Sequence, residues 1–89
     1  MQQMASKRFI IAKQVGGKRV ITNKGEEIGR LSDILIDEND GKLEALVIDP
    51  NSESKLARNL VTKERTIEVP YKAVFAVSDV IVVDEALLV

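Results

Sequence analysis

Short apolar runs separated by glycine, asparagine and proline dominate the chain, a pattern typical of β-strands joined by tight turns. The run RVIT at residues 19–22 precedes Asn23-Lys24-Gly25, which suits a hairpin because Asn and Gly tolerate positive φ. The runs EIGRLSDILID at residues 27–37 and KLEALVID at residues 42–49 flank DENDG, the strongest turn signal in the sequence. We therefore predict three successive strands that pair antiparallel as a meander.

The second half of the chain is less regular. Residues 51–65 begin as a polar loop, and their SKLARNLV segment suits either two turns of helix or the extension of a strand. We interpret residues 51–65 as a connection across the end of a barrel. A strand at residues 66–69 is then expected to stop at Pro70. Three further elements follow: a short turn or 3₁₀ helix and two strands, at residues 71–74, 75–77 and 80–83.

Four residues are predicted to act through the backbone. Gly25 and Gly41 fit turn positions, and Pro70 interrupts a strand. Gly29, inside the second strand, indicates a bulge or the close approach of another backbone segment. These are structural positions, and we expect no ligand at any of them.

Three apolar runs break the alternation expected of a strand with one face in water. They are Ile34–Ile36, Leu46–Ile48 and Val80–Val83, and such strands are buried on both faces. A small barrel has one interior, so the second face must meet residues 51–65, residues 86–89 or a second copy of the chain. A two-fold dimer is the commonest way for a small protein to cover excess apolar surface, and we therefore predict a homodimer.

The composition argues against catalysis. The 89 residues contain no cysteine and no histidine, which excludes thiolate chemistry and removes the commonest general base and metal ligand. An EF-hand interpretation of DENDG fails because its first and last ligand positions fall on Ile36 and Val47. Adjacent carboxylates such as Glu26-Glu27 point to opposite faces of a strand, so they cannot act as a pair. We expect no enzyme, no cofactor, no metal and no small-molecule substrate.

Length and charge predict one domain with a basic start. We place a single core at residues 17–89, after an arm or extra strand at residues 1–16. Nothing in the chain resembles a membrane span or a secretion signal, so we expect a cytoplasmic protein. Residues 1–30 hold seven basic side chains against two acidic ones, although the net charge is −1. We interpret the arm as a solubilising tail; the alternative is RNA binding through Lys7, Arg8 and Lys13.

The sequence resembles the PRC-barrel domain family. The matching segments are GKRVITNKGEEIGRLSDILID, DGKLEALVID and VPYKAVFAVSDVIVVDE, which together cover residues 17–85. The family includes part of the photosynthetic reaction-centre H subunit, a domain of ribosome maturation factors, and short stand-alone archaeal proteins, which this chain is most similar to. The resemblance implies a mostly β protein: a small, strongly bent antiparallel β-barrel of about six strands with one short helical turn.

The resemblance also implies a binding function. Family members bind other macromolecules, and some stand-alone archaeal members are similar to cell-division proteins that bind the membrane-anchored adaptor of the tubulin-like division ring. Our first hypothesis is therefore a dimeric protein–protein adaptor, recruited to the membrane or division site through its partner. The alternative is a ribosome- or RNA-associated maturation factor, whose binding would weaken steeply as salt rises.

The candidate interface with a partner or second copy is apolar. Its N-terminal members, Phe9, Ile10 and Ile11, either add a strand to a partner's sheet edge or pair within the barrel or dimer. The full set is Phe9, Ile10, Ile11, Tyr71, Val80, Val82, Leu87 and Leu88.

Overall fold

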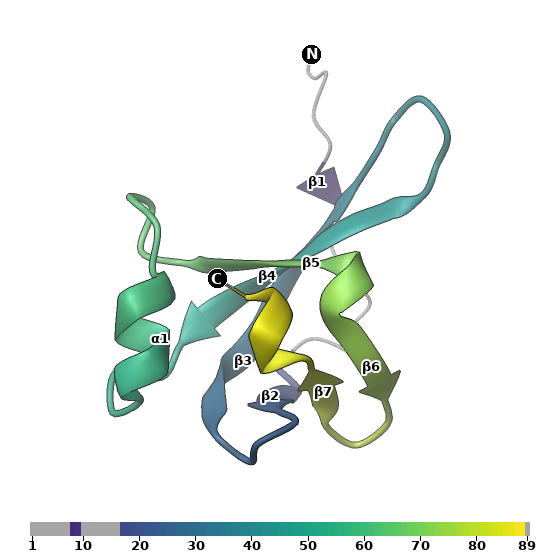
Figure 1. Ribbon diagram of the computed structural model, residues 1–89. Coiled ribbons are helices and arrows are strands. Elements are labelled where there is room, and N and C mark those ends of the chain that lie inside the picture. Colours follow the sequence, from purple (N-terminus) through teal and green to yellow (C-terminus); the bar gives the residue numbers. More distant parts are fainter. Residues whose placement is uncertain (1–7, 10–16, 89) are drawn as a thin grey trace.

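The computed structural model describes residues 8–9 and 17–88, which contain seven strands and three short helices (Figure 1). The strands are β1 (Arg8–Phe9), β2 (Arg19–Thr22), β3 (Glu27–Ile36), β4 (Leu43–Pro50), β5 (Ile67–Pro70), β6 (Val74–Val77) and β7 (Ile81–Val83). The helices are α1 (Lys55–Leu60) and the 3₁₀ helices η1 (Tyr71–Ala73) and η2 (Glu85–Leu87). The protein is thus mostly β, as predicted.

The predicted meander is confirmed, because β3 pairs antiparallel with both β2 and β4. The first turn closes where the Gly25 amide donates to the Thr22 carbonyl at 2.9 Å. In the second turn the Asp37 carboxylate accepts from the Asn39 amide at 2.8 Å, and the Gly41 amide donates to the Asp37 carbonyl. Hydrogen bonds to side-chain acceptors of this kind replace backbone hydrogen bonds between strands, so the strands end at these turns.

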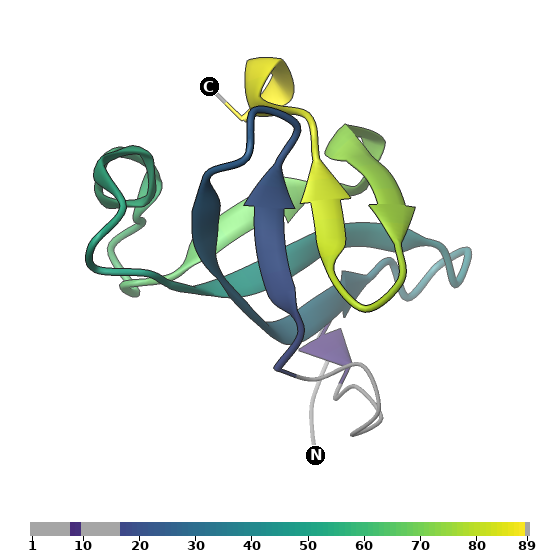
Figure 2. The ribbon, with the colours of Figure 1, turned by 90° about the horizontal axis from the view of Figure 1, so that it is seen from below.

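Strand β3 organises the sheet because different parts of it have different neighbours. β4 pairs along one edge of β3 from Gly29 to Ile36. The other edge pairs with β2 near its start and with β1 near its end, where Arg8 lies opposite Leu35. Register shifts in both long pairings bend the strand. The sheet therefore folds over on itself, and Figures 1 and 2 show β2, β7 and β6 crossing over β4 and β5.

One pairing corrects the expectation of an antiparallel barrel. β2 and β7 run parallel, with Val20 opposite Ile81 and Thr22 opposite Val83. A parallel pair needs a long crossover connection, and here the whole segment between these two strands supplies it. Turn signals determine the direction of strands that follow each other in the chain. They do not determine the direction of strands that meet from opposite ends of it.

The strand order is β5-β4-β3-β2-β7-β6, with β1 on the free part of the β3 edge. No pairing joins β5 to β6 among the described residues, so the strand path there is open. Its two ends are nonetheless linked in the chain by η1 alone, which confirms the short 3₁₀ turn expected after Pro70.

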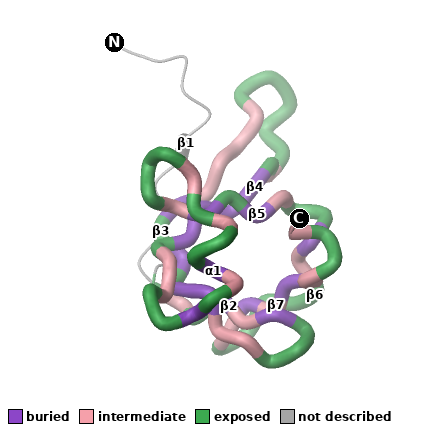
Figure 3. The backbone as a smooth tube through the Cα atoms, turned by 60° about the vertical axis from the view of Figure 1, so that its left-hand side comes forward, coloured by how far each residue is buried: buried purple, intermediate pink, exposed green. Residues whose placement is uncertain are grey.

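The core fills the inside of the folded sheet. Its largest fully buried side chains come from five strands, and exposed turns surround the buried stretches in Figure 3. They are Val20, Ile28, Ile48, Ile67, Val69, Ile81 and Val83.

The prediction of burial on both faces holds for one apolar run and is wrong for the other two. Leu46–Ile48 is fully buried. Ile34–Ile36 is only half-buried, and in the last run Ile81 and Val83 are buried while Val80 and Val82 are half-buried. β7 therefore keeps the alternation of a strand with one inner face, because the described part of the chain places nothing that fully covers its outer face.

The segment between β4 and β5 forms a capped helix rather than a strand extension. Ser54 caps α1: its Oγ accepts from the Ala57 amide at 3.1 Å and donates to the Glu26 carboxylate at 2.5 Å. Leu56 and Leu60 pack against the core and Ala57 is buried in it. The Glu26 contact ties the start of this helix to the β2–β3 turn, so α1 has a defined position against β3.

Candidate functional site

The described residues offer little that resembles a catalytic centre. No three acidic side chains among them gather closely enough to hold a metal ion. None of the helices in the described ranges has the length and apolar character that crossing a membrane requires. The described surface does carry an apolar hollow, a larger hollow with two glutamates beside it, and one apolar strand.

The first hollow is an apolar groove of about 190 Å³, formed where the sheet folds over. Its lining contains one polar side-chain group, the hydroxyl of Tyr71. Strands β3 and β4 form one wall, and η1, β6 and β7 form the other. The lining residues are Leu31, Ile34, Leu43, Leu46, Tyr71, Val74, Val77 and Ile81. Such a groove suits an apolar side chain of another protein, because it offers contact area without hydrogen-bond partners.

Strand β6 borders this groove and is the most exposed apolar strand of the described sheet. Phe75 is 60% exposed and Val77 58%, and Tyr71, just before the strand, is 55% exposed. By contrast, Ile81 and Val83 of neighbouring β7 are buried. The pairing of β6 with β7 shifts register between Val74 and Ala76, so Phe75 has no paired residue on β7. We call Tyr71, Phe75, Val77 and the groove beside them the β6 surface.

The edge position of β6 adds to this exposure. β6 lies at one end of the strand path and pairs only with β7 among the described residues, as Figure 2 shows. Natural sheets usually protect such edges with charges, proline or a covering segment. Here Lys72 and Asp79 flank the strand and leave the strand itself apolar. An apolar edge next to an apolar groove is a suitable place for another chain to add a strand.

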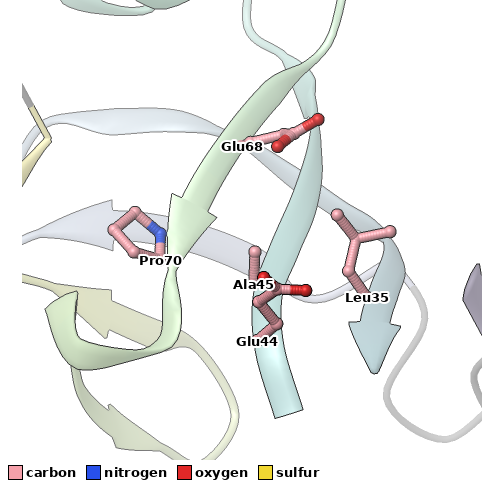
Figure 4. A pocket seen from close by; sticks show the side chains of 5 residues that line it. All are labelled: Leu35, Glu44, Ala45, Glu68 and Pro70. Carbon is pink, nitrogen blue, oxygen red and sulfur yellow. The ribbon is translucent and has the colours of Figure 1, made fainter. Parts of the chain in front are cut away.

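The second hollow has a larger volume, about 410 Å³, and lies on β3, β4 and β5 (Figure 4). Glu44 and Glu68 project beside it, and Leu35, Ala45 and Pro70 complete its lining. Carboxylates accept hydrogen bonds and repel phosphates, so this face does not suit RNA.

The three glycines predicted to act through the backbone do so. Gly25 and Gly41 sit at positive φ with open space around them. At Gly29, a β-carbon would collide with the Asp49 carbonyl oxygen and come within 2.8 Å of the Ile48 side chain. The close approach predicted for this glycine is therefore confirmed, and it lets β4 lie tightly against β3.

The predicted interface residues that the structure describes differ in exposure. Tyr71 and Leu87 are exposed, whereas Val80, Val82 and Leu88 are half-buried and Leu88 packs against the core. Phe9 and Arg8 form β1, so this part of the arm pairs within the chain. The remaining predicted arm residues lie outside the described residues: Lys7, Ile10, Ile11 and Lys13.

Sequence reasoning missed Phe75 and Val77 as candidate interface residues. A signal was present: Val74–Val77 is apolar on both parities, like the three runs singled out above. Periodicity cannot tell a strand buried on both faces from an apolar strand at an open edge, because both produce the same run.

Two comparisons place the chain among known proteins. A family model described as PRC-barrel domain matches residues 8–88, which include every described element. An uncharacterized protein of the archaeon Methanocaldococcus jannaschii is 39% identical over 74 residues, covering 83% of this chain and 80% of that protein.

Proposed function

The chain belongs to the PRC-barrel domain family, and from this premise we propose that it is a non-enzymatic protein–protein adaptor that binds its partner through the β6 surface. The observation that carries this proposal is the exposure of Tyr71, Phe75 and Val77 beside a groove of apolar side chains. Aromatic side chains at the centre of an apolar patch are typical of residues that dominate binding energy.

The free energy gained by covering the exposed part of Phe75 supports the β6 surface as the binding site. An aromatic side chain buries about 150–250 Å² when covered. With 60% of Phe75 exposed, covering the rest of this ring removes about 90–150 Å² of apolar surface from water, worth about 2–4 kcal/mol at about 25 cal/mol per Å². The exposed fractions of Val77 and Tyr71 add to this gain.

Finer features of the function are also proposals. We propose that the folded-over sheet forms a small, partly open barrel whose gap lies between β5 and β6, the two strands that η1 alone links in the chain. A cytoplasmic homodimer that binds a cell-division partner at the membrane is the arrangement that the family resemblance favours. The archaeal source of the relative fits this proposal. We favour the adaptor over RNA binding, because the backbone of Arg8, one of the three basic arm residues, pairs with β3.

Affinity capture from archaeal extract tests the adaptor proposal. Wild-type protein is compared with Phe75→Ser/Val77→Ser, with and without ribonuclease, and bound proteins are quantified by mass spectrometry. The matched control is Val61→Ser, which changes an exposed apolar residue after α1, outside the β6 surface. Circular dichroism verifies that all variants fold.

We expect specific proteins that survive ribonuclease, are lost with the double variant and are kept with the control. An identified partner is then titrated directly against the same three proteins. If the double variant captures the same set as wild type, the β6 surface is not the docking site. If ribonuclease removes the whole set, the protein is an RNA-associated factor instead.

A further inference from the structure

We infer that the β6 surface is occupied by a second copy of the same chain, joined by antiparallel pairing of the two β6 strands about a two-fold axis. This inference rests on the proposed binding role of the β6 surface: the second copy occupies that surface in the protein without its adaptor partner, and the two compete for the same site. The position of the strand, its apolar side chains and the charges at its two ends support this occupant.

The position of β6 permits the pairing. It is the last strand of the described path, and Figure 2 shows no strand beyond it. A two-fold axis perpendicular to the sheet brings identical edges together and makes them antiparallel. The two sheets would then continue into each other, with each β6 flanked by its own β7 and by the partner's β6.

The side chains of β6 are suited to a copy of themselves. Phe75 and Val77 are apolar and exposed, and Ala76 between them is small and exposed. In an antiparallel pair each such side chain gains a directly opposed or diagonal neighbour from the other strand. A second copy supplies apolar neighbours, so no polar group of the partner has to be buried against the groove.

The charges at the two ends of β6 favour the same occupant. Lys72 precedes the strand and Asp79 follows it; both are exposed, and neither forms an ion pair among the described residues. Antiparallel pairing brings the end of one strand that carries Lys72 toward the end that carries the partner's Asp79. The symmetry repeats this contact, so the dimer gains two opposite-charge contacts, whereas a parallel arrangement would place like charges together.

The length of β6 limits the strength of the dimer. Four residues of strand span about 13 Å, and a standard stable interface buries about 800 Å² on each partner. The β6 pairing alone falls at the weak end of this range. We therefore expect a reversible dimer whose population depends on protein concentration, and which exchanges subunits freely.

Reversing the charges at the two ends of β6 tests this geometry. Dimerisation is measured by sedimentation velocity over a range of protein concentrations at low salt. Lys72→Asp places two acidic groups at each contact, and Asp79→Lys places two basic groups there. Each variant alone is expected to dimerise roughly tenfold more weakly, because two weak attractions become two repulsions. In a mixture, the dimer of one variant with the other has one contact between two introduced, opposite charges and one between the two original ones. This mixed dimer is therefore expected to form with wild-type affinity.

Matched controls carry the same changes in charge away from β6. Lys63→Asp and Glu53→Lys alter exposed residues of the segment that contains α1, and they are expected to dimerise like wild type. A wild-type protein that stays monomeric overturns the inference. So does a dimer that is insensitive to both exchanges, or one that mixing does not restore.

The outcomes are separable from the test of the adaptor proposal. A monomeric wild type that still captures a partner lost with Phe75→Ser/Val77→Ser refutes self-pairing and leaves the adaptor proposal standing. In the opposite case, a dimer shows the expected charge response while the double variant captures the same partner proteins as wild type. That result refutes the adaptor's docking site and supports self-pairing.

Discussion

Replacing Gly29 by alanine is expected to be among the most damaging single-methyl changes in the described part of this protein. The new β-carbon would collide with the backbone carbonyl of Asp49, which cannot move aside like the end of a flexible side chain. The φ of 156° adds backbone strain of about 1–3 kcal/mol for a residue other than glycine. Overpacking adds about 1–3 kcal/mol. A domain of this size has a total free energy of unfolding of about 5–13 kcal/mol, so the expected loss of about 2–6 kcal/mol is a large part of it.

Urea unfolding followed by far-UV circular dichroism measures this loss, and Gly25→Ala is the matched control. Gly25 also has positive φ, 90°, but a β-carbon there meets nothing within 4 Å. The control should therefore lose only the strain, about 1–2 kcal/mol. In thermal unfolding the gap between the variants corresponds to about 4–8 °C for each kcal/mol. If Gly29→Ala lies within about 1 kcal/mol of Gly25→Ala, the close approach of β3 and β4 is not what requires glycine.

Three further substitutions test other parts of the structure by the same urea titration. Ser54→Ala removes the cap that accepts from the Ala57 amide, and should cost about 1–2 kcal/mol; an unchanged midpoint would mean that α1 does not need this cap. Ile48→Ala empties a fully buried position and should cost about 2–5 kcal/mol; a loss below about 1 kcal/mol would contradict its place in the core. Arg19→Ala breaks a 3.4 Å ion pair with Glu27 between partly exposed side chains, and should cost less than about 0.5 kcal/mol; a larger cost would show that this pair matters more than its exposure suggests.

Interactions between neighbours in the chain made much of the fold predictable. The turns at Gly25 and Gly41 depend on residues that tolerate positive φ, and Pro70 pre-sets the backbone for η1. Gly29 could be recognised because glycine weakens the interior of a strand and is found there mainly at bulges and where another backbone segment comes close. These features are encoded within a few residues of where they occur.

The remaining features depend on contacts between distant segments. The parallel pairing of β2 with β7 follows from how the whole sheet folds over, which local periodicity does not record. The same limit applies to the candidate site. The apolar run Val74–Val77 could be recognised, but its exposure depends on its place at the end of the strand path, so Phe75 and Val77 could not be separated from core residues in advance.

The parallel pairing of β2 and β7 also has a consequence for how the chain acquires its structure during synthesis. β2 leaves the ribosome well before its neighbour β7, because all the elements from β3 to β6 lie between them in the chain. Contacts between residues so distant in the chain close late and slow the folding reaction. Ribosome-bound chains that lack β7 should therefore stay sensitive to protease, with one edge of β2 unpaired, and resistance should appear only once residues 81–83 have emerged. Completion of the fold is thus tied to the emergence of β7.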